Sequence, residues 1–131
     1  MAEQQPEIQL IANLVVVRPD GHVLLVRYRA DDERWWLPGE DLEPYEHPDD
    51  RARAVLAGFH SLTVASITMN EVESFRGRRG WHVVFTYRVE ADGEPGGGFP
   101  AEWFPADELP RTVHGRWERE RVGRALETAA G

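Results

Sequence analysis

Six carboxylates lie close together in one short part of the 131-residue chain, between positions 40 and 50. They are Glu40, Asp41, Glu43, Glu46, Asp49 and Asp50. Hard divalent cations take several oxygen ligands, and carboxylates supply them best. One interpretation is therefore a cation site on this loop. The alternative is a solvated acidic loop whose last members stabilise the start of a helix, and we favour it because no second group of ligands is apparent.

The residues around this loop resemble the Nudix box. Residues 36–62 read WLPGEDLEPYEHPDDRARAVLAGFHSL, and the family's pattern begins with W-x-L-P-G-G and continues through one early Glu to an Arg-Glu pair and a Glu-Glu pair. Glu46 falls at the early Glu without a gap. The segments PDGHVLLVRYR and EWFPADELP are similar to the family's first hairpin and to its late E-L-P segment. The resemblance covers roughly residues 8–128.

Most of the residues that would bind metal are missing from this box. Counting on from Glu46, Ala54 and Val55 stand in place of the Arg-Glu pair, and Gly58 and Phe59 in place of the Glu-Glu pair. In the family these glutamates bind Mg²⁺ or Mn²⁺, which activates water for attack on a diphosphate. The resemblance therefore implies the fold, while the missing carboxylates predict loss of the usual metal-dependent chemistry. We expect no cofactor; Mg²⁺ or Mn²⁺ would bind only if ligands had moved elsewhere.

The hydrophobic pattern predicts the elements that would position this loop. Alternating and continuous apolar runs predict strands at 8–18, 22–29, 35–37, 63–75, 81–91 and 101–104. Helices are expected from Pro48 to about residue 60 and at 116–129, with a helical turn at 107–110. Apolar residues of the first helix form one stripe, Ala52, Val55, Leu56 and Phe59. The order matches one α/β (α+β) domain over residues 1–131, an α/β/α sandwich of the Nudix type with a mixed central sheet.

Several side chains are candidates for binding a ligand beside this box. Arg27 and Arg29 alternate on the second expected strand, so they would share a face and could hold a diphosphate; the alternative is that both face solvent. Trp36 is expected to pack under the box, and Trp81 or Trp103 could stack on a base, although core packing is the default role of tryptophan.

Composition excludes several classes of function. The net charge of −8 argues against a broad basic surface for nucleic acid. The chain has no cysteine, and no apolar run approaches the length of a membrane helix. All 15 basic residues are arginine, so phosphate recognition would use guanidinium groups. A cytoplasmic location, without nucleic-acid or membrane partners, is the expectation.

Three hypotheses follow for the function. The first is a pseudoenzyme that binds a nucleotide, a phosphorylated small molecule or a protein partner. The second is a divergent hydrolase of a nucleoside diphosphate derivative, with Glu43 and Glu46 among relocated acidic ligands. The third is a subunit of a homodimer or a larger complex. Fold alone cannot choose among them, because function resides in the site.

Overall fold

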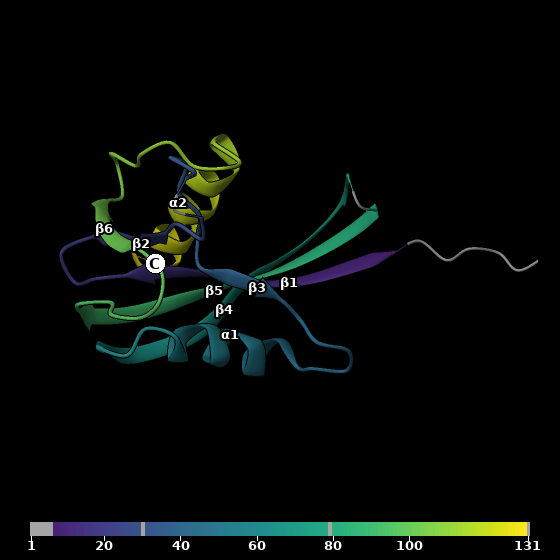
Figure 1. Cartoon of the computed structure of the whole chain (residues 1–131), viewed down its shortest axis with the longest axis horizontal. Helices are drawn as coiled ribbons and strands as arrows, with labels where there is room; N and C mark the ends of the chain where they lie inside the picture. The colour runs from purple at the N-terminus through teal and green to yellow at the C-terminus, as the bar shows by residue number, and fades with distance from the viewer. Residues whose placement is uncertain (1–6, 30, 79, 131) are drawn as a thin grey trace, which may run out of the picture.

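Two helices enclose a six-stranded sheet in the computed structural model, which describes residues 7–29, 31–78 and 80–130 (Figure 1). The strands are β1 (Ile8–Val17), β2 (His22–Val26), β3 (Gly39–Asp41), β4 (Leu62–Gly77), β5 (Gly80–Gly93) and β6 (Ala101–Pro105). The helices are α1 (Pro48–Ala57) and α2 (Arg116–Ala130). None of the helices in the described ranges is long and apolar enough to cross a membrane.

The sheet is mixed, as the sequence predicts. Its order is β4-β5-β1-β2-β6, with β3 paired to β1 beside this path. β1 and β5 run parallel, whereas the other pairs are antiparallel. The predicted hairpin of β1 and β2 is confirmed, with Gly21 in its turn at φ 85°. A left-handed φ of this kind is accessible to glycine without steric cost.

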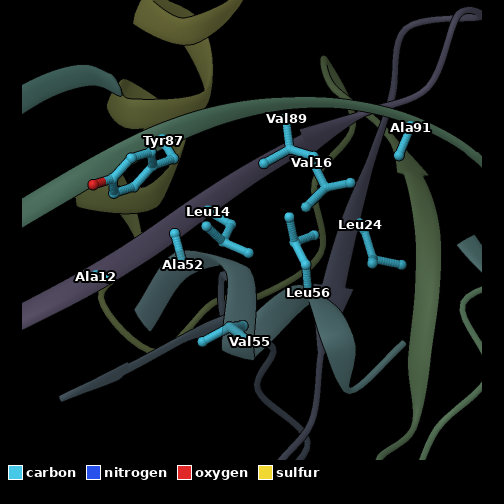
Figure 2. Close-up of a cluster of buried hydrophobic side chains, with 10 residues drawn as sticks. All are labelled: Ala12, Leu14, Val16, Leu24, Ala52, Val55, Leu56, Tyr87, Val89 and Ala91. Atoms are coloured by element: carbon cyan, nitrogen blue, oxygen red, sulfur yellow. The ribbon is translucent and has the colours of Figure 1, made fainter. Parts of the chain in front are cut away.

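Each face of the sheet carries its own hydrophobic core. Residues of even number in β1 face α1, and those of odd number face α2, because successive strand residues point to opposite faces. The α1 side gathers Ala12, Leu14, Val16, Leu24, Ala52, Val55, Leu56, Tyr87, Val89 and Ala91 (Figure 2). The α2 side gathers Val15, Val17, Val23, Leu25, Leu37, Val122 and Ala125. The α/β/α sandwich is thereby confirmed.

Helix α1 forms where the sequence predicts it, for local reasons. His47 is the N-cap and its Nδ1 accepts a hydrogen bond from Asp49 N–H at 3.1 Å. Pro48 occupies the first turn, where a missing N–H costs nothing. The predicted apolar stripe faces the sheet, and the helix ends at Gly58.

Other expected elements differ from the structure. β2 ends at Val26 rather than at residue 29, because its partner β6 begins at Ala101 and the preceding Pro100 has no N–H to continue the ladder. Residues 35–37 form isolated bridges, Val26 with Trp36 and Trp35 with Thr112, and not a strand. The helical turn expected at 107–110 lies earlier, as a turn in which Glu108 N–H donates to Pro105 O at 3.0 Å. Strand β3 is not among the predicted elements.

The outer ends of β1, β4 and β5 form an arm that extends past both helices (Figure 1). On its α1-side face, four apolar residues are exposed: Ile8, Leu10, Val72 and Trp81. Helix α2 is attached to β4 by a buried arginine, because Arg121 Nε donates to Glu73 Oε2 at 2.7 Å and its guanidinium lies over the Trp117 ring.

Candidate functional site

The acidic loop is held closed by one arginine from helix α1. Arg51 Nε donates to Glu46 Oε1 at 2.8 Å and Nη2 donates to Glu46 Oε2 at 3.0 Å, while Nη1 donates to Glu40 Oε2 at 2.6 Å. Glu46 Oε1 also accepts the Glu43 backbone N–H at 3.0 Å. The Arg51 guanidinium, followed by the Glu43 N–H, lowers the pKa of Glu46. Glu46 thus supports the loop, and its carboxylate oxygens are engaged by a guanidinium.

The positions at which the Nudix pattern has Glu do not present oxygen ligands. Val55 is 7% exposed and belongs to the core beneath the helix (Figure 2). Gly58 has no side chain, and Phe59 packs against the same core. Among the described residues there is no group of three or more His, Asp, Glu or Cys side chains that could hold a metal ion. The donor set therefore does not fit the Mg²⁺ or Mn²⁺ that the fold family implies.

A further carboxylate of the loop, Asp49, is turned toward the sheet. Tyr87, from β5, donates a hydrogen bond from its hydroxyl to Asp49 Oδ1 at 2.5 Å. Burial of the ring, followed by this bond to Asp49, raises the pKa of the Tyr87 hydroxyl. The contact fixes the first turn of α1 against the sheet and occupies one oxygen of Asp49.

A cavity of about 740 Å³ opens on the other face of the sheet. Its floor comes from β1, β3 and β5, and one wall comes from the start of α2. Its lining is mostly apolar or aromatic, and includes Ile11, Tyr28, Trp36, Phe75, Val84 and Trp117. This volume lies within the range of small-molecule sites in proteins, roughly 300–1,000 Å³.

Edge-to-face ring contacts build the aromatic wall of the cavity. The Trp36 ring centroid lies 6.0 Å from that of Tyr28 and 5.7 Å from that of His114. His114 in turn lies 5.7 Å from Trp117. Such arrangements are favoured by the quadrupoles of the rings. They link the segment before β3 to the first turn of α2.

A buried glutamate orients His114 in this wall. Glu118 is only 1% exposed. Its Oε2 lies 2.7 Å from His114 Nδ1, and its Oε1 accepts a hydrogen bond from the His114 backbone N–H at 2.9 Å. The bond to Glu118 raises the pKa of His114, against a smaller lowering by burial. The ring is half-exposed and lines the cavity, so it offers a titratable group beside Trp36.

Two polar groups lie at the floor of the cavity. The Tyr28 hydroxyl donates to Gly39 O and accepts from Gly39 N–H, both at 3.0 Å, so its single donor is used. The Asn13 amide lies over Gly39, where a Cβ would come 2.1 Å from Asn13 Oδ1. Within the described part of the chain, no hydrogen bond engages the Asn13 amide. It remains available to a ligand in the cavity.

The cavity includes only one of the residues expected to bind a ligand, Trp36. Arg27 lies over the Trp35 ring at 5.5 Å, and Arg29 pairs with Asp31 in solvent. Both lie beyond the end of β2, so they do not share a strand face as expected.

The other expected binding residues lie away from the cavity. Trp81 is on the opposite face of the arm, 44% exposed, with its Nε1 bonded to Ser74. Trp103 packs on the α1 side beneath Arg18. Glu46 and Glu43 lie in the box loop outside the cavity lining, although Glu40 borders both regions.

Solved structures with the same arrangement include Nudix hydrolases. A UDP-X diphosphatase matches with a TM-score of 0.76 and 18% sequence identity. The match covers 100% of this chain and 66% of the diphosphatase, so this chain spans just under two thirds of the length of that protein. A MutT Nudix hydrolase from Burkholderia pseudomallei has a TM-score of 0.68 and 21% identity over 88% of this chain and 98% of that one. The MutT protein from Bacillus halodurans has a TM-score of 0.63 and 22% identity, covering 86% and 80%. No protein-family profile and no curated protein matches the sequence. The chain has the Nudix fold, as the sequence predicts.

Proposed function

We propose that this Nudix-fold protein binds a small nucleotide-related molecule in the aromatic cavity and lacks the standard metal-dependent hydrolase activity. The observation that carries the proposal is the position of Arg51. Its guanidinium bridges Glu40 and Glu46, two of the six loop carboxylates that could have served a cation site. A bound cation would have to displace this internal cation while gaining no carboxylate from Val55, Gly58 or Phe59.

The divergent-hydrolase alternative would need relocated ligands. Glu43 is exposed in the loop and Glu46 is already paired with Arg51. A hydrolase of this kind would require Glu46 to leave Arg51 before it could bind Mg²⁺. The ion pair between Arg51 and Glu46 therefore favours ligand binding without hydrolysis.

Turnover and binding assays on the same substrates test the proposal. Nucleoside di- and triphosphates, ADP-ribose and UDP-sugars are chosen as probes, the last because one similar structure is a UDP-X diphosphatase. Each would be incubated with and without Mg²⁺ or Mn²⁺, beside an active Nudix hydrolase. We expect no metal-dependent release of phosphate or nucleotide. Turnover that requires metal and disappears in Glu46→Gln would establish the hydrolase alternative instead.

A second candidate function is self-association through the arm. Ile8, Leu10, Val72 and Trp81 place exposed apolar groups on one face of a three-stranded sheet. Contiguous apolar patches on a surface commonly mark interfaces. The same face on a second copy would cover them symmetrically. Light scattering across a range of concentrations tests this: Val72→Lys should shift the protein toward the monomer, whereas Thr68→Lys elsewhere on β4 should not.

A further inference from the structure

The charges that line the cavity are poorly matched to a polyphosphate. Its carboxylates are Glu40, Asp41 and Glu118, and its only guanidinium is Arg78 among the described residues. Glu40 is paired with Arg51, and Glu118 with His114. A diphosphate ester carries more than one negative charge, and each carboxylate nearby would repel it.

The two arginines expected to hold a diphosphate, and Arg51 of the box loop, do not line this cavity. Arg27 stacks over Trp35, Arg29 pairs with Asp31, and Arg51 is held in the box loop. No divalent cation is available in our proposal to neutralise the phosphates. Among the described residues, the anionic half of a nucleotide would therefore meet one lining guanidinium, that of Arg78, beside three carboxylates.

The chemistry of the cavity suits the other half of a nucleotide. Trp36, Tyr28 and Trp117 offer aromatic surface, and planar heterocycles bind such surfaces by stacking or edge contacts. The Asn13 amide presents one donor group and one acceptor at the floor, without a protein partner in the described chain. An asparagine amide can bond a base edge at two points, as it does with adenine.

We propose, in an inference that rests on the proposed function, that the ligand is an uncharged nitrogen heterocycle, namely a nucleobase or a nucleoside without phosphate. The Asn13 amide forms hydrogen bonds with this ligand, and Trp36 packs against it. Addition of phosphates weakens binding in this site. Such selectivity is the reverse of that expected for a hydrolase of nucleoside diphosphate derivatives. The volume of about 740 Å³ leaves room for a sugar beside a two-ring base.

Calorimetric titration of the whole protein at pH 7.5 tests the proposal. The probes are adenosine, guanosine, cytidine and uridine, each compared with its 5′-mono- and diphosphate, with and without Mg²⁺. We expect at least one nucleoside to bind and its affinity to fall with each phosphate added, with no recovery in Mg²⁺. A diphosphate that binds more tightly than its nucleoside, or a failure of every nucleoside to bind, would overturn the assignment.

Two matched substitutions locate the site. Asn13→Ala should weaken nucleoside binding about tenfold, whereas Gln9→Ala, an amide on the same face of β1 outside the cavity, should not change it. Equal affinity of Asn13→Ala and the unmodified protein would overturn the role of the amide. If Asn13→Ala fails to fold, the phosphate series on the unmodified protein still decides the ligand class.

Failure of this inference can be told apart from failure of the proposed function. Tighter binding of diphosphates without turnover would reject the uncharged heterocycle and leave a non-hydrolytic nucleotide-binding protein. Metal-dependent turnover would reject the proposed function itself. Falling affinity along the phosphate series, together with the loss in Asn13→Ala, would support both.

Discussion

Arg51 and Glu46 form a two-point ion pair across the start of helix α1, with the guanidinium nitrogens Nε and Nη2 at 2.8 and 3.0 Å from the two carboxylate oxygens. In the Nudix pattern an arginine at position 54 helps orient a glutamate, and Ala54 stands there instead. Arg51 lies three residues earlier, about one helical turn, so it projects from nearly the same side of the helix. The chain thus retains an arginine that orders the loop although the metal-binding residues are gone.

Removing this pair should loosen the loop. We expect Arg51→Ala to lower the melting temperature by a few degrees, because Glu40 and Glu46 then lose a shared partner and repel each other. Arg53→Ala is the matched control, since Arg53 is exposed on the same helix and forms no hydrogen bond that is described. Thermal denaturation followed by circular dichroism compares the two variants, and equal melting temperatures would show that the pair is unimportant.

The same pair gives a defined dependence of stability on pH. The pKa of Glu46 is lowered below its ordinary value of 4.5, chiefly by Arg51. A lowered carboxyl pKa contributes stability that is present above 4.5 and is lost as pH falls through the folded-state value. The unmodified protein should therefore lose more stability than Glu46→Gln between pH 5 and roughly pH 3. Urea titrations at a series of pH values measure the difference, and parallel curves for both proteins would contradict the assignment.

Restoring a single glutamate should not restore a metal site. Val55→Glu would place a carboxylate in the α1-side core, where Val55 is 7% exposed. The cost of burying an unpaired charge predicts a loss of about 3 kcal/mol or more in the free energy of unfolding. Ala54→Glu, at the exposed neighbouring position, should change it little. The prediction would be wrong if Val55→Glu were as stable as Ala54→Glu and were further stabilised by Mn²⁺. That result would mean that the introduced carboxylate reaches solvent and binds the cation.

The elements that the sequence predicts well are those with local causes. The β1–β2 hairpin follows from Pro19, Asp20 and Gly21 between two apolar runs, and α1 follows from Pro48 and its apolar stripe. The length of β2 could not be judged in this way, because its end depends on Pro100, some 70 residues later in the chain.

The candidate site was less accessible to prediction because its parts meet only in three dimensions. Asn13, Tyr28 and His114 come from three separate segments, and only Tyr28 lies in a segment that resembles the family, the first hairpin. The pairing of Asn13 with Gly39, through an unpredicted strand, brings the first two together. Trp36 was identified only because the W-x-L-P-G segment preceded the box. The spacing of Arg51 from Glu46, five residues, is visible in the sequence, but the sequence pattern does not show that the two side chains pair.

Protonation of His114 should depend on Glu118. The hydrogen bond between Nδ1 and the Glu118 carboxylate raises the pKa of His114 above its ordinary value of 6.5, against the lowering by burial and by the charge of Arg34. A raised histidine pKa contributes stability that is fully present below pH 6.5 and is lost as pH rises through the folded-state value. NMR titration of the ring should show the pKa falling in Glu118→Gln. Glu120→Gln on the same helix, which removes an exposed partner of Arg116, should leave it unchanged; equal effects of the two variants would exclude a specific role for Glu118.

Gly39 should be intolerant of a side chain for a reason tied to the cavity. A Cβ there would lie 2.1 Å from Asn13 Oδ1 and 2.7 Å from the Ala12 carbonyl oxygen, and the backbone oxygen cannot move aside. Overpacking of this kind predicts a loss of about 1–3 kcal/mol in the free energy of unfolding for Gly39→Ala.

Gly123→Ala is the matched comparison, because nothing lies within 4 Å of its Cβ position in helix α2. That variant should gain about 0.5–1 kcal/mol from the helix preference of alanine. Changes of opposite sign in the free energy of unfolding, measured by chemical denaturation, would confirm the close approach of β1 and β3. A neutral Gly39→Ala would show that the Asn13 amide and the backbone of β1 both move aside.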